Sequence, residues 1–244
     1  KMPSKSTKKA CRNCWWKPQT FREKYLVNSR RLCALVCWYL LILCSPLEAA
    51  EESPVNLAPN ISAGKYLFQA AGGCSCHTDT KNNSAFLAGG RPIETPFGTF
   101  YGTNITPDPE TGIGNWSDED FIRAMTQGLS PDGNHYFPVF PYTSFQRISR
   151  KDLLALKAYL FSLPPVRQKN LPHDLILPFG EQYAMMFWKN FVWSPEPFIL
   201  NPERTESWNR GEYLAQALAH CGECHTPRNL LGALKPEMHF AGSK

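Results

Sequence analysis

Two clusters of cysteine and histidine are the residues of this sequence best suited to chemistry. They are Cys74-Ser-Cys76-His77 and Cys221-Gly-Glu-Cys224-His225. Two thiols followed directly by a histidine form the pattern that attaches haem c. The thiols add to the two vinyl groups, and the histidine then lies beside the iron. The sequence therefore predicts two haem c sites, with His77 and His225 as iron ligands.

Both clusters belong to an internal repeat. A segment with Gly, Tyr, Leu, Gln and Ala in the same order precedes each cluster, from 64 to 70 and from 211 to 217. Each glycine lies ten residues before the first cysteine of its cluster, and the repeat unit is about 148 residues long. Repetition on this scale predicts tandem haem domains of one kind.

The first cluster lacks one residue between its cysteines. The distance between two thiols must match the fixed distance between the haem vinyl groups, so an ordinary loop cannot form both thioethers. Haem could be held by Cys76 alone, by both cysteines with strain, or without a covalent bond. We expect at most one thioether, through Cys76, because Cys76 keeps its place beside His77.

The first 50 residues are predicted to be a signal peptide or an N-terminal anchor. Residues 1–49 contain ten Lys or Arg and two Glu, and a run of 13 apolar residues ends at Cys44 before a stretch of small residues. That order is typical of export signals, and the run is shorter than the ~20 residues that span a bilayer. Export predicts a periplasmic protein. The remaining residues carry 16 basic and 19 acidic side chains, which argues against nucleic acid as a partner.

Helix signals surround the first cluster. They predict helices from Ser62 to about Ala71, from Ser117 to Gly128, and from Ser149 to Leu163, the last two beginning at serines with an Asp three residues later. Residues 79–116 are rich in Gly, Pro, Asn and Thr and predict a long loop around the haem. Because no strand pattern competes, we expect an all-α fold of tandem small cytochrome c domains.

The predicted domains follow from these elements. A first haem domain covers 56–165, a surface strap rich in proline and aromatic residues covers 166–204, and a second haem domain begins at 205. The apolar run 183–192 within the strap could contact a partner or a membrane, or pack between the domains. Residues 205–244 are too few to surround a haem, so we expect this second domain to be truncated and the sequence to be a fragment.

Several longer motifs resemble a known family. They include Asn104-Ile-Thr-Pro-Asp108, Phe137-Pro-Val-Phe-Pro-Tyr142 and Cys221-Gly-Glu-Cys-His-Thr-Pro-Arg228. Over about residues 60–244, the chain resembles the multi-haem cytochrome c subunits of membrane-associated alcohol, aldehyde and gluconate dehydrogenases. The resemblance implies that the chain relays electrons from a periplasmic dehydrogenase to quinone or a terminal oxidase. It also implies possible membrane association and no catalytic residues, because the dehydrogenase oxidises the substrate.

The resemblance also frames the search for a distal ligand of the first haem. In that family the chain returns to the iron roughly 50–65 residues after the proximal histidine, a window that here contains Met125, His135 and Phe140. Phe140 stands where the family often has methionine, and a benzene ring cannot ligate iron. We expect His135 to be the candidate ligand and Met125 the weaker one. A solvent-facing loop position for His135 and core packing for Met125 remain the alternatives.

Two other functions fit the same residues. An open sixth iron position at the first haem would permit peroxidase-like or sulfur-oxidising chemistry, which would make the chain a haem enzyme. Cysteine and histidine also bind zinc, so the chain could be a zinc-stabilised interaction module.

Overall fold

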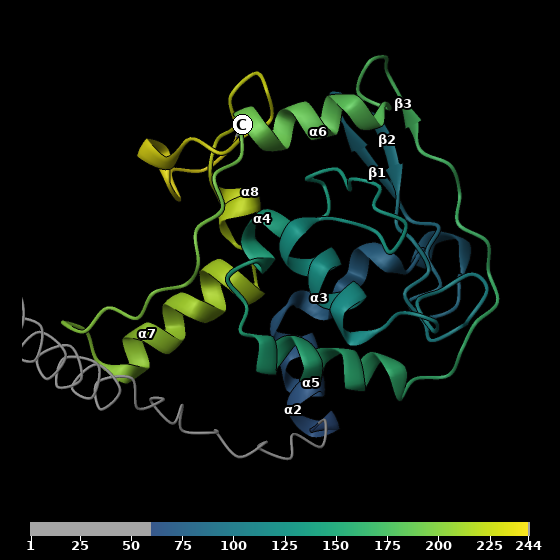
Figure 1. Cartoon of the computed structure of the whole chain (residues 1–244), viewed down its shortest axis with the longest axis horizontal. Coiled ribbons are helices and arrows are strands. Elements are labelled where there is room, and N and C mark those ends of the chain that lie inside the picture. Colours follow the sequence, from purple (N-terminus) through teal and green to yellow (C-terminus); the bar gives the residue numbers. More distant parts are fainter. Residues whose placement is uncertain (1–59, 244) are drawn as a thin grey trace, which may run out of the picture. The chain divides into compact units, whose positions relative to one another are not determined.

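The computed structural model describes residues 60–243 (Figure 1). The predicted signal peptide or anchor, residues 1–50, lies outside the described residues. Among residues 60–243, no helix is both long and apolar enough to cross a lipid bilayer.

The central packing contact joins α2 (Ile61–Ala70) and α5 (Arg150–Phe161). Gly64 makes it possible, because a Cβ atom there would lie 1.9 Å from the backbone oxygen of Ala155. The rings of Phe68 and Tyr159 then pack with their centroids 5.1 Å apart. Asn60 caps α2, and Ser62, where the helix was predicted to begin, lies within it.

Two helix predictions are confirmed by their caps. Ser117 and Asp120 form a capping box at the start of α3 (Asp118–Gln127), and Gly128 ends the helix in the left-handed conformation with φ +61°. Ser149 caps α5 by accepting a hydrogen bond from the backbone of Asp152. A short helix, α4 (Tyr142–Phe145), lies between them in the chain.

The predicted all-α fold class is wrong, because a three-stranded antiparallel sheet stands beside the helices (Figure 1). Its strands are β1 (Pro92–Thr95), β2 (Gly98–Tyr101) and β3 (Asp174–Leu175). The first two form a hairpin within the segment predicted to be a loop. The third comes from the strap and pairs at Gly98, where a Cβ atom would lie 2.3 Å from the oxygen of Asp174. Strands of two to four residues are too short to show an alternating pattern.

The strap continues into α6 (Gln182–Phe191), which buries Met185 and Trp188. The Trp188 indole donates a hydrogen bond to the oxygen of Leu231, 2.7 Å away. The Lys189 ammonium donates to the carbonyl of Gln127, the last residue of α3, and to that of Gly128, which caps the helix. The strap is thus attached to both the first haem segment and the C-terminal segment.

The second repeat packs on the first. It contains α7 (Glu206–Tyr213), a π-helical turn (Leu214–Leu218) and α8 (Gly222–His225). The Tyr213 hydroxyl donates to Asp152, 2.7 Å away, and accepts from the backbone nitrogen of Ser149. Tyr213, Ala217 and Leu218 belong to the same buried cluster as Leu67 and Phe121. The two predicted haem segments therefore share one core, and their division into two domains stays a prediction.

Candidate haem centres

The backbone of the first motif turns more tightly than that of the second. Gly72, Gly73 and Cys74 all have positive φ, at 80°, 66° and 49°. At the corresponding place in the second motif, Cys221 is right-handed with φ −55° and begins a regular helical turn. A left-handed turn is how the first motif accommodates its missing residue. Two glycines adopt this conformation freely, whereas Cys74 is strained in it by roughly 1–3 kcal/mol.

The two thiols of the first motif differ in environment. Cys74 contacts the buried cluster, and burial, with a smaller effect of the neighbouring Cys76, raises the pKa of Cys74 to about 12. Cys76 is exposed, and both thiols are free of disulfides. Since Cys74 holds its proton and lies inward, the two cysteines do not present equivalent thiols. Attachment through Cys76 stays a prediction.

His77 has the hydrogen bonding of an iron-ligating histidine. Its Nδ1 lies 2.7 Å from the carbonyl oxygen of Thr103. Burial lowers the pKa of His77, although the bond to Thr103 opposes this shift. A carbonyl only accepts, so Nδ1 carries the proton and the Nε2 lone pair stays available. Metal-ligating histidines usually donate their other ring N–H in this way, so the residues present fit a haem iron.

The sheet brings the Thr103 carbonyl to His77. Strand β2 leads directly into Gly102, where a Cβ atom would lie 1.9 Å from the oxygen of Cys76. Backbone bonds join the same segments, from Gly89 to the His77 oxygen and from Gly90 to the Gly102 oxygen, both at 2.8 Å. Glycine at 102 therefore allows the end of β2 to lie directly on the haem motif.

Asn104 ties this loop to the strap. It is 2% exposed, and its side-chain nitrogen donates to the oxygens of Val166 at 2.7 Å and Gln168 at 3.2 Å. Its backbone nitrogen donates to the Asn170 side chain at 2.6 Å. The residue after Thr103 is thus anchored from three sides, which holds the Thr103 carbonyl in place.

The candidate distal residues lie in different settings. Met125 is buried in the core on α3, as ordinary packing requires. Nδ1 of His135 is buried and has no hydrogen-bond partner among residues 60–243. Burial, with a smaller effect of Lys189, lowers the pKa of His135 and so favours the neutral ring. A neutral imidazole with an unengaged nitrogen is suited to ligation. Phe140 packs on Tyr136 and Phe145.

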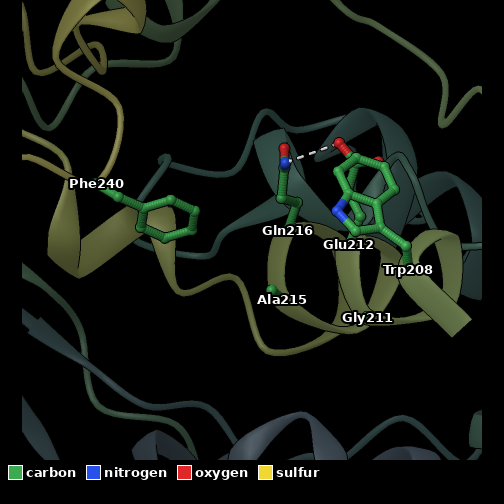
Figure 2. A pocket seen from close by; sticks show the side chains of 6 residues that line it. All are labelled: Trp208, Gly211, Glu212, Ala215, Gln216 and Phe240. Atoms are coloured by element: carbon green, nitrogen blue, oxygen red, sulfur yellow. Dashed lines mark hydrogen bonds between the residues drawn. The ribbon is translucent and has the colours of Figure 1, made fainter. Parts of the chain in front are cut away.

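The second motif is more open. Cys221 is half-buried, whereas Cys224 and His225 are exposed. A shallow depression lies on the adjoining helix, and Figure 2 shows the six residues that line it: Trp208, Gly211, Glu212, Ala215, Gln216 and Phe240. Gly211 corresponds to Gly64 of the first repeat, but nothing lies within 4 Å of a Cβ atom built there. The face that α5 covers on α2 is therefore open on α7 in the described part of the chain.

Sequence reasoning missed the residues that position these motifs. The Thr103 carbonyl carries no side-chain signal, and the role of Gly102 depends on a contact with Cys76. Asn104 stands out in the sequence only as part of a longer motif. Among the described residues, no group of three or more His, Cys, Asp or Glu side chains is arranged to hold a metal ion.

Known proteins place the chain in a family, although no family model matches it. A diheme cytochrome c-type protein of Cereibacter sphaeroides is 40% identical over 205 residues, which cover 83% of this chain and 69% of that protein. The fructose dehydrogenase cytochrome subunit of Gluconobacter japonicus is 39% identical over 199 residues, 80% of this chain. A nicotinate dehydrogenase subunit of Pseudomonas putida is 49% identical over 167 residues, 68% of this chain.

The chain spans only part of most of these relatives. It covers 41% of the fructose dehydrogenase subunit and 14% of the nicotinate dehydrogenase subunit. The match to the diheme cytochrome covers more than two thirds of both proteins. A haem-binding family also fits the hydrogen bond of His77, which leaves Nε2 available to iron. The chain therefore belongs to the multi-haem cytochrome c family, which includes a diheme cytochrome c and cytochrome subunits of fructose, gluconate and alcohol dehydrogenases.

Proposed function

We propose that this chain carries two haem c groups and relays electrons from a periplasmic dehydrogenase partner to quinone or a terminal oxidase. The observation that carries the proposal is the His77 ring, fixed through Nδ1 by Thr103 beside two cysteines, together with the second motif at 221–225. Names of relatives support the partner and the acceptor, since they include cytochrome subunits of dehydrogenases and of an alcohol dehydrogenase (quinone).

In the proposed function the dehydrogenase partner oxidises the substrate, and this chain has no catalytic residue. Bound haem would supply one-electron chemistry. Cys76 or Cys74 would hold the first haem and Cys221 and Cys224 the second, with His77 and His225 ligating iron. The chain's own contribution is to orient each histidine and to exclude water with the shared core. The proposal divides the chain into two haem segments, 56–165 and 205–244, joined by the strap 166–204.

Haem loading tests the proposal. The chain is expressed with a cytochrome maturation system, and haem per chain is counted from the pyridine haemochrome spectrum and the protein mass. We expect a haem at the first motif, which His77→Ala removes or releases from iron, and a second haem that is loaded less completely because residues 205–244 are too few to surround it. His173→Asn serves as the control, because it removes an imidazole of the strap and leaves an amide oxygen that can accept from the backbone nitrogen of Tyr101. Zinc in place of haem would refute the proposal.

Electron transfer is tested separately. The reduced, haem-loaded protein is mixed with a soluble quinone analogue, and reoxidation is followed at the haem absorption bands. We expect reoxidation by quinone without turnover of any alcohol or sugar by the chain alone. Rapid turnover of peroxide, with carbon monoxide binding to the reduced first haem, would instead support the haem-enzyme alternative.

A further inference from the structure

We propose that Glu223 is a positioning residue that locks the second haem motif onto α4 and so fixes the distance between the two haems. The inference rests on the proposed function, because it requires haem at both motifs. Glu223 lies between Cys221 and Cys224, and α4 begins two residues after Phe140, on the predicted distal side of the first haem.

The contacts of Glu223 cross from one repeat to the other. Its Oε1 accepts hydrogen bonds from the hydroxyls of Thr143 at 2.8 Å and Ser144 at 2.7 Å, about 80 residues earlier in the chain. Its Oε2 pairs with the Arg228 guanidinium at 2.5 Å. The glutamate side chain is 7% exposed, so the carboxylate is both buried and fully engaged.

Haem attachment does not explain this burial. The attachment pattern needs the two thiols and the histidine, and it leaves the residues between the cysteines free. The first motif illustrates this, since Ser75 between its cysteines is exposed. A buried carboxylate is costly unless donors surround it, and here three donors do. The surroundings of Glu223 therefore serve the contact with α4.

Arg228 completes the set of contacts around Glu223, and these four residues, Thr143, Ser144, Glu223 and Arg228, form the clamp. The Arg228 guanidinium also donates to the backbone oxygens of Glu223 at 3.1 Å and Gly232 at 2.7 Å. The arginine thereby braces the glutamate against the loop that follows the second motif. Loss of the carboxylate would leave the arginine, two hydroxyls and that loop without their common partner.

A continuous series of rings runs beside the clamp. The ring of Phe140 packs on Phe145 with centroids 5.8 Å apart, and Phe145 packs on His220 at 5.2 Å. His220 directly precedes Cys221, a predicted point of haem attachment. The segment that Glu223 holds is thus the one that connects the predicted distal side of the first haem to the second haem.

Two variants separate position from charge. Glu223→Gln removes the negative charge, whereas Thr143→Val with Ser144→Ala removes the two hydroxyl donors and leaves the charge in place. Glu212→Gln is the matched control, because Glu212 lies on α7 and accepts a hydrogen bond only from Gln216 among the described side chains. All are made in the full chain and loaded with haem.

The readouts are the distance distribution between the two ferric haems, from pulsed electron paramagnetic resonance, and the potential of each haem. We expect Thr143→Val with Ser144→Ala to broaden the distribution most. Glu223→Gln should broaden it less, because an amide oxygen still accepts from both hydroxyls, and the control should leave it unchanged. Only Glu223→Gln should also raise the potential of the second haem, because a nearby negative charge stabilises ferric iron.

The outcomes distinguish this inference from the proposed function. A wild-type preparation in which no chain carries haem at the second motif would refute the two-haem function and this inference with it. Two haems in the wild type, with an unchanged distribution in both clamp variants, would overturn the positioning role alone. Loss of the second haem in both variants would also overturn it, by assigning Glu223 to haem attachment.

Discussion

Gly102→Ala tests how the sheet holds the first haem motif. A Cβ atom at this position would lie 1.9 Å from the oxygen of Cys76 and 3.3 Å from Cα of His77. Both are backbone atoms, so no side chain can rotate away. An ordinary contact needs about 3.4 Å, and the end of β2 must therefore move by about 1.5 Å. The 2.7 Å bond from His77 Nδ1 to Thr103 would then exceed hydrogen-bonding distance.

Two contributions set the size of the effect. The crowded backbone costs about 1–3 kcal/mol, and the lost hydrogen bond costs about 1 kcal/mol more. We expect the free energy of unfolding to fall by about 2–4 kcal/mol. A His77 that no longer donates from Nδ1 is a weaker base, so the potential of the first haem should rise and iron affinity should fall by about 10–100-fold.

The assay combines urea unfolding of the haem-loaded protein with a redox titration of the first haem. Gly180→Ala is the matched control, because a Cβ atom there would meet only the Leu175 Cβ at 3.7 Å. We expect that variant to stay within about 0.5 kcal/mol of wild type. Wild-type stability together with a wild-type potential in Gly102→Ala would refute the reasoning.

Four further predictions concern single residues. Cys76→Ser should release haem from the first site on a denaturing gel of a chain whose second motif is inactivated; retained haem would contradict attachment through Cys76. His135→Ala should abolish the low-spin signal of the first haem in electron paramagnetic resonance, and an unchanged signal would eliminate His135 as a ligand. Gly64→Ala should lower the free energy of unfolding by about 1–3 kcal/mol because of the 1.9 Å contact, whereas the equivalent Gly211→Ala should not. Burial lowers the pKa of Lys189 to about 8 from 10.5, so the unfolded chain binds more protons between these values and stability should rise with pH there. Urea unfolding at pH 7 and pH 10 should show a smaller rise in Lys189→Met, and an equal rise would contradict the assignment.

The helices that sequence predicts well are those with local signals. Ser117 and Asp120 lie three residues apart, and their capping box forms as the pattern indicates. The same holds for Ser149 at the start of α5. These contacts need nothing from distant parts of the chain, which is why local residue types suffice to locate them.

The sheet could not be predicted from local pattern. Strand β3 has two residues and pairs with β2 across more than 70 positions in the chain. Its partner Gly98 would be assigned to a turn by its residue type alone. The all-α prediction failed because the strands of the β1–β2 hairpin are too short to show a pattern and because the pairing of β3 with β2 is a tertiary contact.

The candidate site likewise has residues that the sequence identifies and residues that it does not. The type and spacing of the cysteines and histidines indicate haem attachment, so both motifs could be identified from the sequence. The Thr103 carbonyl and the packing of Glu223 on α4 have no such signal, since any residue has a carbonyl and glutamate is usually exposed.

The attachment of Asn104 to residues 166–170 has a consequence in time. A chain made from its N-terminus reaches Asn104 about 60 residues before it reaches the carbonyls that Asn104 binds. During that interval the loop from β2 to Asp108 lacks its partner in the strap. A haem-attaching enzyme that works as the chain emerges would therefore meet a His77 whose carbonyl partner, Thr103, is not yet held by the strap, and arrival of the strap would fix the orientation of the ring.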